Sequence, residues 1–188
     1  MERPKLLIDE EVLAEPRHMI VSNTNIRGVI WGINKHFSDI SGYSAKELKG
    51  VNHNILRHPD MPKIIFKLMW DRITNGHNIL AFVKNVRKDG RYYWVITDFE
   101  VMFKRNDPTE IYKFYAYRKA APRHSLDEII ELYASLLKEE KKSGEKASEE
   151  YLNTYLARKK MSYDEYMQSL IKQKKKGLFG RVAKSLFG

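Results

Sequence analysis

Short apolar runs separated by polar turns open the chain. Residues 18–23 (HMIVSN) and 28–34 (GVIWGIN) are mostly apolar or β-branched, and the polar residues 24–27 (TNIR) lie between them. Two such runs joined by a short polar segment predict a β-hairpin. The next stretch, 35–50, is rich in small polar residues, and its Ser44 and Glu47 have the spacing of a capping box. We therefore expect two short helical turns there.

A longer helical pattern follows at 61–76. Asp60 stands where an N-cap side chain is expected, Pro62 suits a first helical turn, and Gly76 suits a C-terminal end. The apolar positions in this stretch recur at the spacing of one helix face, and they are Ile65, Phe66, Met69, Trp70 and Ile73. The pattern predicts a helix that Asp60 caps and that buries this face.

Three strand patterns come next, at 78–86, 91–105 and 110–120, with the turns RKDG and NDPT between them. In the second strand, side chains such as Tyr93, Val95 and Thr97 alternate with Tyr92 and Trp94, which is the period of a β-strand. Together with the hairpin, these elements predict an α+β fold. We expect a five-stranded antiparallel sheet with short helices on one face, followed by C-terminal helices.

The C-terminal part is predicted to be helical and separate. Residues 122–142 form an amphipathic helix that Ser125 and Glu128 cap, and its apolar stripe contains Leu126, Ile129, Ile130, Tyr133, Leu136 and Leu137. Residues 143–177 are expected to be a polar linker, centred on KKSGEKAS, and a helical hairpin with capping-box spacing at Ser162 and Glu165. Residues 178–188 form a basic amphipathic tail, which is either a membrane-surface tether, a docking peptide or a solvated end.

Composition narrows the class of protein. The chain has 188 residues, of which 43% are hydrophobic, so it can bury a core. It contains no cysteine, which excludes disulfides, cysteine-ligated metals and a thiol nucleophile. Neither a secretory signal nor an apolar run of about 20 residues, the length of a membrane span, is visible. The expected location is therefore the cytoplasm.

The net charge of +10 is unevenly distributed. Residues 158–188 contain nine Lys or Arg and two acidic residues, whereas the first 120 residues mix basic and acidic side chains. A nucleic-acid module would show a basic stripe with interleaved aromatic residues. No such stripe is present in the first 120 residues, so we do not expect nucleic-acid binding.

The stretch 53–62 (HNILRHPDMP) carries the densest chemistry. Arg57 offers a planar fork of donors and His58 both a donor and an acceptor, so each either binds a ligand or holds the loop to neighbouring carbonyl groups. Asn34 and Asn85 each end an apolar strand, where a buried amide needs partners. No nucleophile, phosphate-binding loop or helical zinc pair accompanies them, so we do not expect an enzyme.

These elements and motifs resemble one known family. SGYSxxEL (41–48), HNxxRHPDMP (53–62) and KNxRKDGxYYWV (84–95) occur in the order and at the separation typical of the Aer-type PAS sensor domain. The resemblance covers residues 18–121, with 1–17 as an N-terminal cap. It implies a PAS fold that binds FAD non-covalently and senses redox or energy state. The cofactor-binding residues that it implies are Asn34, Arg57, His58, Asp60, Phe66, Trp70 and Asn85.

One departure from the family leaves alternatives open. Ile79 stands where the family usually has Trp, and Ala81 with Phe82 adds bulk where a glycine would leave room. A pocket plugged by Ile79, Phe82 and Trp70 would make a cofactor-free interaction adaptor. A reshaped pocket would admit haem, with His53, His58 or His77 as the axial ligand.

The resemblance also implies partners. We expect a subunit of a split energy-taxis (aerotaxis) receptor that signals through a HAMP-containing methyl-accepting chemotaxis transducer. A homodimer and a contact of residues 172–188 with the inner membrane surface are further expectations. In this family logic the sensor changes its contacts when the flavin is reduced, because a ring nitrogen that accepted a hydrogen bond becomes a donor.

Overall fold

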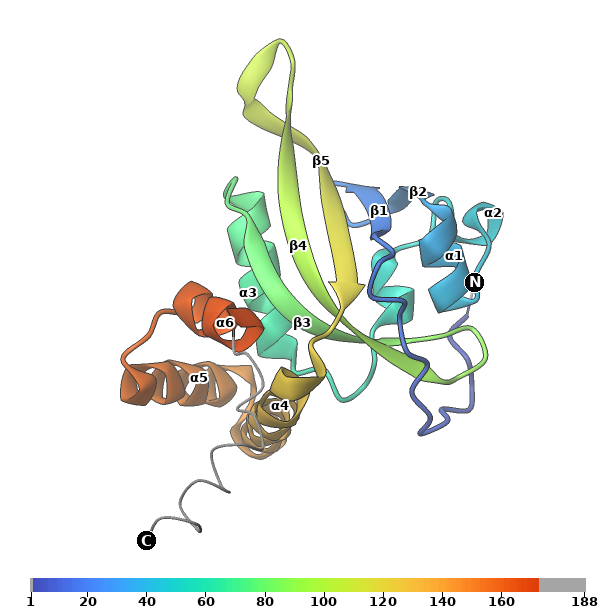
Figure 1. The fold of residues 1–188 in the computed structure, drawn as a ribbon. Helices are drawn as coiled ribbons and strands as arrows, with labels where there is room; N and C mark the ends of the chain where they lie inside the picture. Colours follow the sequence, from blue (N-terminus) through green and yellow to red (C-terminus); the bar gives the residue numbers. More distant parts are fainter. Residues whose placement is uncertain (1, 173–188) are drawn as a thin grey trace, which may run out of the picture.

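The computed structural model describes residues 2–172, and within them five antiparallel strands form one sheet of order β2-β1-β5-β4-β3 (Figure 1). The strands are β1 (Ile20–Asn25), β2 (Ile30–Ile33), β3 (Ile79–Val86), β4 (Tyr92–Lys104) and β5 (Asp107–Ala120). The predicted hairpin and three-stranded meander are both present. The α+β fold class expected from the sequence is therefore confirmed.

Short helices connect the two halves of the sheet. They are α1 (Lys35–Ser41), α2 (Ala45–Leu48) and the 3-10 helix η1 (His53–Leu56). The Asn34 side chain accepts from the Phe37 N–H and caps α1, while Ser44 and Glu47 form the predicted capping box of α2. Local side-chain bonds thus fix where both helices begin.

Helix α3 (Lys63–Thr74) begins later than expected and has a different cap. Its N-cap residue is Pro62, whose side chain has no hydrogen-bond acceptor, and the predicted Asp60 cap is wrong. The Asp60 carboxylate instead accepts from Lys84 Nζ of β3 at 2.7 Å. The Lys63 N–H donates to Glu140 Oε2 at 2.7 Å, so a residue far along the chain caps α3.

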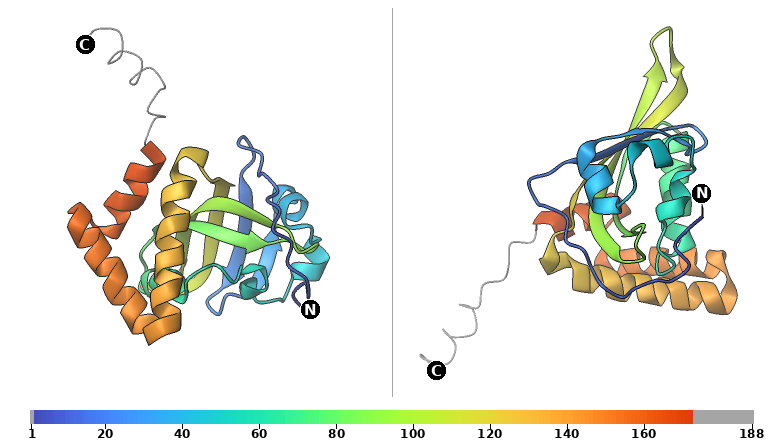
Figure 2. Two further views of the ribbon diagram at one scale, coloured as in Figure 1. Left: turned by 90° about the horizontal axis from the view of Figure 1, so that it is seen from below. Right: turned by 90° about the vertical axis from the view of Figure 1, so that its right-hand side faces the viewer.

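The C-terminal helices are α4 (Arg123–Ser143), α5 (Glu145–Lys159) and α6 (Tyr163–Lys172), which lie together at the end of the sheet nearest β3 (Figures 1 and 2). The Tyr133 hydroxyl of α4 donates to the Phe82 carbonyl of β3 at 2.9 Å, and the Trp94 ring of β4 lies 6.1 Å from the Tyr133 ring. Leu126, Ile129 and other apolar side chains of these helices join the core of the sheet.

Two expectations for this part were wrong. Ser125 does not cap α4, which begins two residues earlier; its buried hydroxyl donates to the Leu170 carbonyl of α6. The stretch expected to be a polar linker is helical on both sides of Gly144. The predicted Ser162–Glu165 capping box is confirmed. The predicted tail, 178–188, and the membrane-contact segment from 173 onward lie outside the described residues.

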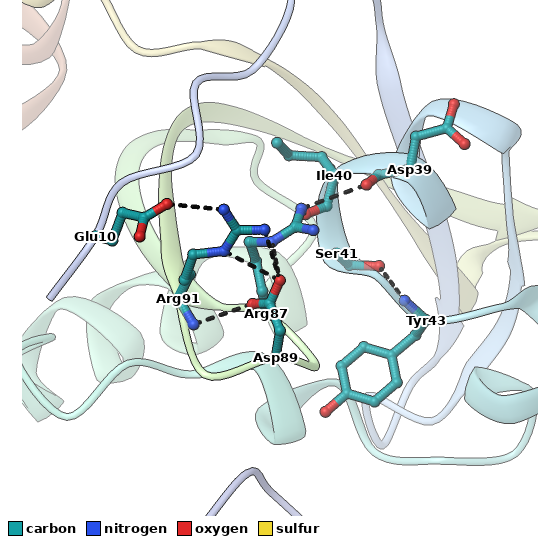
Figure 3. Close-up of polar contacts among 8 residues, drawn as sticks. All are labelled: Glu10, Asp39, Ile40, Ser41, Tyr43, Arg87, Asp89 and Arg91. Atoms are coloured by element: carbon teal, nitrogen blue, oxygen red, sulfur yellow. Dashed lines mark hydrogen bonds and ion pairs between the residues drawn. The ribbon is translucent and has the colours of Figure 1, made fainter. Parts of the chain in front are cut away.

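The N-terminal segment is held against the β3–β4 turn (Figure 3). Glu10 pairs with Arg91 at 2.8 Å, and Asp89 pairs with both Arg91 and Arg87. Gly90 has φ +91°, and a Cβ there would lie 2.2 Å from the Leu6 carbonyl oxygen, so glycine permits this close approach.

Among residues 2–172, the helices are all too short or too polar to cross a bilayer.

Candidate functional site

A cavity of about 490 Å³ lies between α3 and one face of the sheet. Helix α3 contributes an apolar wall of Phe66, Met69, Trp70 and Ile73, which is the face that its sequence pattern predicted. The volume falls within the usual range of small-molecule sites, about 300–1,000 Å³. The expected alternative, a pocket plugged by side chains, is therefore not what the structure has.

Strand alternation explains why the cavity stays open. Val83 and Asn85 of β3 line it, so the alternating residues Phe82 and Lys84 point to the opposite face of the sheet. Phe82 therefore does not fill the cavity, as the alternative of a plugged pocket required, but is buried in the core, and its carbonyl accepts from Tyr133 of α4. Ile79 is buried without lining the cavity, whereas Trp70 forms part of its wall.

The sheet side of the cavity carries polar side chains that lack partners. Asn85 is 3% exposed and Thr97 is 0% exposed. Within the described chain, the Asn85 Nδ2 and the Thr97 Oγ1 are both buried without a hydrogen-bond partner. Buried polar atoms are nearly always paired in folded proteins. Both unpaired polar atoms are therefore available to a polar molecule in the cavity.

A second polar group on the wall is built around Arg118 of β5. Its guanidinium donates to the Ser22 hydroxyl at 3.0 Å, to the Ala116 carbonyl at 3.1 Å and to His53 Nε2 at 2.9 Å. Burial, followed by the nearby Arg118 charge, lowers the pKa of His53 to about 3. His53 is therefore neutral at physiological pH and accepts from Arg118 through Nε2.

Arg57 closes another part of the wall. Its guanidinium carbon lies 4.1 Å from the centre of the Phe66 ring, and its Nη2 donates to the Met61 carbonyl at 3.1 Å. The stacking holds the planar fork against α3. Burial lowers the pKa of Arg57, although the group stays charged at physiological pH.

Only some of the cofactor-binding residues expected from the sequence line the cavity. Arg57, Phe66, Trp70 and Asn85 line the cavity, whereas Asn34, His58 and Asp60 do not. The Asn34 amide is used within the chain, because it accepts from the Val21 and Phe37 N–H groups and donates to the Met19 carbonyl.

The other two residues outside the cavity have partners of their own. His58 Nδ1 accepts from the Asp60 N–H at 3.1 Å, and the His58 ring packs edge-on against Tyr92 at 5.7 Å. Asp60 pairs with Lys84, whose ammonium also lies 4.0 Å from the centre of the Tyr92 ring. These contacts hold the loop that carries His58 and Asp60 against the last part of β3 and the first residue of β4, and not against the cavity.

Several lining residues escaped the sequence reasoning. Arg118, Thr97 and Ser22 all line the cavity, and none was a predicted site residue. The alternation of β5 carried a signal, because Arg118 shares a face with the apolar Ala116 and Phe114. A charged side chain on an otherwise buried strand face marks a candidate functional residue.

The fold and the cavity define the class of protein. Residues 30–115 match the family model described as PAS fold. A solved light-oxygen-voltage domain, studied with a flavin analogue, has the same fold: the TM-score is 0.52 at 15% identity over 60% of this chain and 83% of that chain. Residues 30–115 of the chain therefore have the PAS fold.

Two characterised proteins are similar to it in sequence. The aerotaxis receptor of Escherichia coli (strain K12) is 34% identical over 117 residues, which cover 62% of this chain and 22% of the receptor. The bacterioopsin transcriptional activator of Halobacterium salinarum (strain ATCC 700922 / JCM 11081 / NRC-1) is 29% identical over 56% of this chain and 17% of the activator. The resemblance to the Aer-type PAS sensor is confirmed. The chain spans less than a quarter of the length of either relative.

Proposed function

We propose that this PAS domain is a cytoplasmic redox or energy sensor that binds FAD non-covalently in the cavity between α3 and the sheet. It signals by direct contact with a HAMP-containing methyl-accepting chemotaxis transducer. The similarity to an aerotaxis receptor supports this direction. The observation that carries the proposal is the pair of buried, unpartnered polar atoms, Asn85 Nδ2 and Thr97 Oγ1, on the wall of the cavity.

The cavity residues fit a flavin ring. Phe66, Met69 and Trp70 offer an apolar wall for the ring face, while Asn85 and Thr97 offer polar atoms to its edge. When bound, FAD would supply a ring whose nitrogens change protonation and charge on reduction. The Asn85 amide has both a donor and an acceptor end, so it can rotate to match either state. Only contacts that differ between the two states shift the conformation of the protein.

A route from the cavity to the C-terminal helices starts at β3. Asn85 faces the cavity, and Phe82 on the same strand accepts a hydrogen bond from Tyr133 of α4. A displacement of β3 at Asn85 therefore changes the geometry of a bond that holds α4. In this proposal α4 carries the state of the cavity to the transducer.

Haem is the second candidate ligand, and His53 is the observation that bears on it. His53 lines the cavity, whereas His58 and His77 do not. The Nε2 atom of His53 already accepts from Arg118 at 2.9 Å, so coordination of an iron through Nε2 would require that bond to break. The contacts therefore favour a flavin over haem.

The absorbance spectrum of the freshly purified chain tests the proposal. We expect flavin bands, with the released cofactor identified as FAD by mass spectrometry. Asn85→Ala removes a buried partner of the ring edge and should weaken FAD binding about tenfold, the equivalent of one buried hydrogen bond. Asn23→Ala is the matched control, because Asn23 lies in the same sheet and does not line the cavity.

The other spectra would decide against FAD. A haem spectrum would replace FAD with haem in the proposal. A colourless protein that does not bind added FAD would leave the cofactor-free interaction adaptor. Equal loss of FAD in the Asn85 and Asn23 variants would show that Asn85 acts through stability rather than contact.

A further inference from the structure

Arg118 is a buried cation that has no counter-charge among residues 2–172. It is 2% exposed, and it lies on the strand face that forms the sheet side of the cavity. Its hydrogen-bond acceptors in residues 2–172 are a hydroxyl, a carbonyl and an imidazole, all of them neutral. Among the ion pairs formed by the described residues, none includes Arg118.

The ionisable groups around Arg118 do not supply the missing charge. His53 is neutral, and the nearby Tyr93 is also neutral, because burial raises the pKa of its phenol to about 12. The Phe37 ring, 5.3 Å from the guanidinium carbon, adds only a cation–π contact. A buried charge without a partner is costly, and proteins normally pair such groups.

The neighbours of Arg118 hold its fork in place beside the open volume. Ser22 on β1 and His53 on η1 each accept from a different nitrogen of the guanidinium. The cross-strand neighbour of Arg118 on β4 is Thr97, the residue with an unpartnered hydroxyl on the cavity wall. A guanidinium has five N–H donors, and a planar anion matches their geometry.

We propose that Arg118, positioned by Ser22 and His53, is an anion-binding pole of the cavity and selects ligands that place a negative charge beside it. The cavity thus binds a planar anion more tightly than a neutral molecule of the same shape. The proposal rests on the observed cavity, and it deepens the proposed function when the ligand is FAD. In that case Arg118 favours the reduced ring, which after uptake of two electrons and one proton from solution carries one negative charge, over the neutral oxidised ring.

Two lysines at the edge of the cavity do not compete with Arg118 for the part of a ligand that enters it. Lys63 and Lys67 line the cavity from α3, and each is already paired with carboxylates: Lys63 with Glu140, and Lys67 with Asp71 and Glu149. Their charges are therefore balanced within the protein, whereas Arg118 forms no ion pair among residues 2–172. The interior charge of Arg118 therefore acts on the part of the ligand that enters the cavity.

The first test uses benzoate and benzamide, which share a shape and differ in charge. Calorimetric titration of the ligand-free full chain should give benzoate at least a tenfold tighter dissociation constant than benzamide. Arg118→Gln should abolish the preference, and Arg118→Lys should restore part of it because the charge returns. Arg91→Gln is the control, since it removes a surface arginine far from the cavity wall. Equal affinities in the wild-type chain, or a preference that survives in Arg118→Gln, would overturn the proposal.

A measurement on the wild-type chain covers the case in which the variants do not fold. Benzoate should shift the Arg118 Nε–H signal in a nitrogen–proton NMR spectrum, and benzamide should leave it in place. No shift with benzoate would count against the pole even if no variant could be purified.

A second test separates this inference from the proposed function. With dithionite as the electron donor, the FAD-loaded chain should show a midpoint potential that falls in Arg118→Gln, corresponding to at least a tenfold loss of preference for reduced over oxidised FAD. If benzoate is preferred but FAD does not bind, the anion pole stands and the FAD sensor fails. If FAD binds but neither the benzoate preference nor the potential depends on Arg118, the sensor stands and the pole fails.

Discussion

His53 makes the stability of the protein depend on pH. Its pKa is about 3 in the folded chain and about 6.5 when the histidine is exposed. The unfolded chain therefore takes up a proton below pH 6.5 that the folded chain refuses until about pH 3. The stability that His53 confers is complete well above pH 6.5 and falls as the pH is lowered towards 3, by up to about 1.4 kcal/mol per pH unit.

Urea denaturation of the wild-type chain and His53→Gln across pH 7 to 4 tests this. Glutamine keeps an acceptor for Arg118 but cannot take up a proton, so the variant should lose less stability on acidification. His58, whose pKa is also lowered, to about 4, is present in both chains and cancels in the comparison. Two parallel stability curves would contradict the assignment of His53 as a neutral acceptor.

For single residues, the sequence indicated which side chains need polar partners, but it did not indicate whether the partner lies within the chain or in the cavity. Asn34 and Asn85 looked equivalent, each an amide at a strand end. The structure gives Asn34 three partners within the chain and leaves the Asn85 Nδ2 without one. Asn34 caps α1 through the Phe37 N–H three residues away, whereas the position of Asn85 on the cavity wall depends on contacts between segments far apart in sequence.

The start of α3 shows how one helix depends on another. Glu140 on the last part of α4 accepts from the Lys63 N–H and also pairs with Lys63 Nζ at 3.8 Å. Glu140→Ala should lower the free energy of unfolding by about 1 kcal/mol, the usual value of a lost N-cap. Glu131→Ala is the matched control, because Glu131 is exposed on the same helix. Urea denaturation measures both variants.

Hydrogen exchange gives an independent check of this cap. In Glu140→Ala the amides of the first turn of α3 should exchange faster, while those of α1 keep their rates. Unchanged exchange at Lys63 together with a stability equal to that of the Glu131 variant would show that the cap contributes nothing.

Helix ends were predictable only where the capping partners are close in sequence. The Ser44–Glu47 and Ser162–Glu165 pairs formed as expected, since each residue finds its partner three positions away. Asp60 was available for α3 but is paired with Lys84 from β3. A long-range ion pair competes with a local cap, and a single sequence does not reveal which of the two forms.

For the whole molecule, the core is shared between the sheet and the C-terminal helices. Apolar residues of α4, α5 and α6 belong to the same buried cluster as those of β3 and β4. We therefore expect one cooperative unfolding transition. Tryptophan fluorescence reports on Trp31, Trp70 and Trp94 in the PAS domain, and far-UV circular dichroism is dominated by the helices. The two signals should change at the same urea concentration.

Loss of helical signal at lower urea than the fluorescence change would contradict this single unit. It would show that the C-terminal helices detach while the sheet remains folded.

The order of elements was predictable from periodicity and turn residues alone. The docking of α4 on the sheet was not, because it depends on contacts such as Tyr133 to Phe82, which lie 51 residues apart.

The corner between α4 and α5 reaches the cavity as well. Glu145, the first residue of α5, lines it beside Lys63 and Lys67 of α3. A bound molecule therefore borders the helical corner directly. A ligand that touches Glu145 thus contacts the sheet, α3 and the C-terminal helices at once, so its affinity depends on how these helices are docked as well as on the pocket itself.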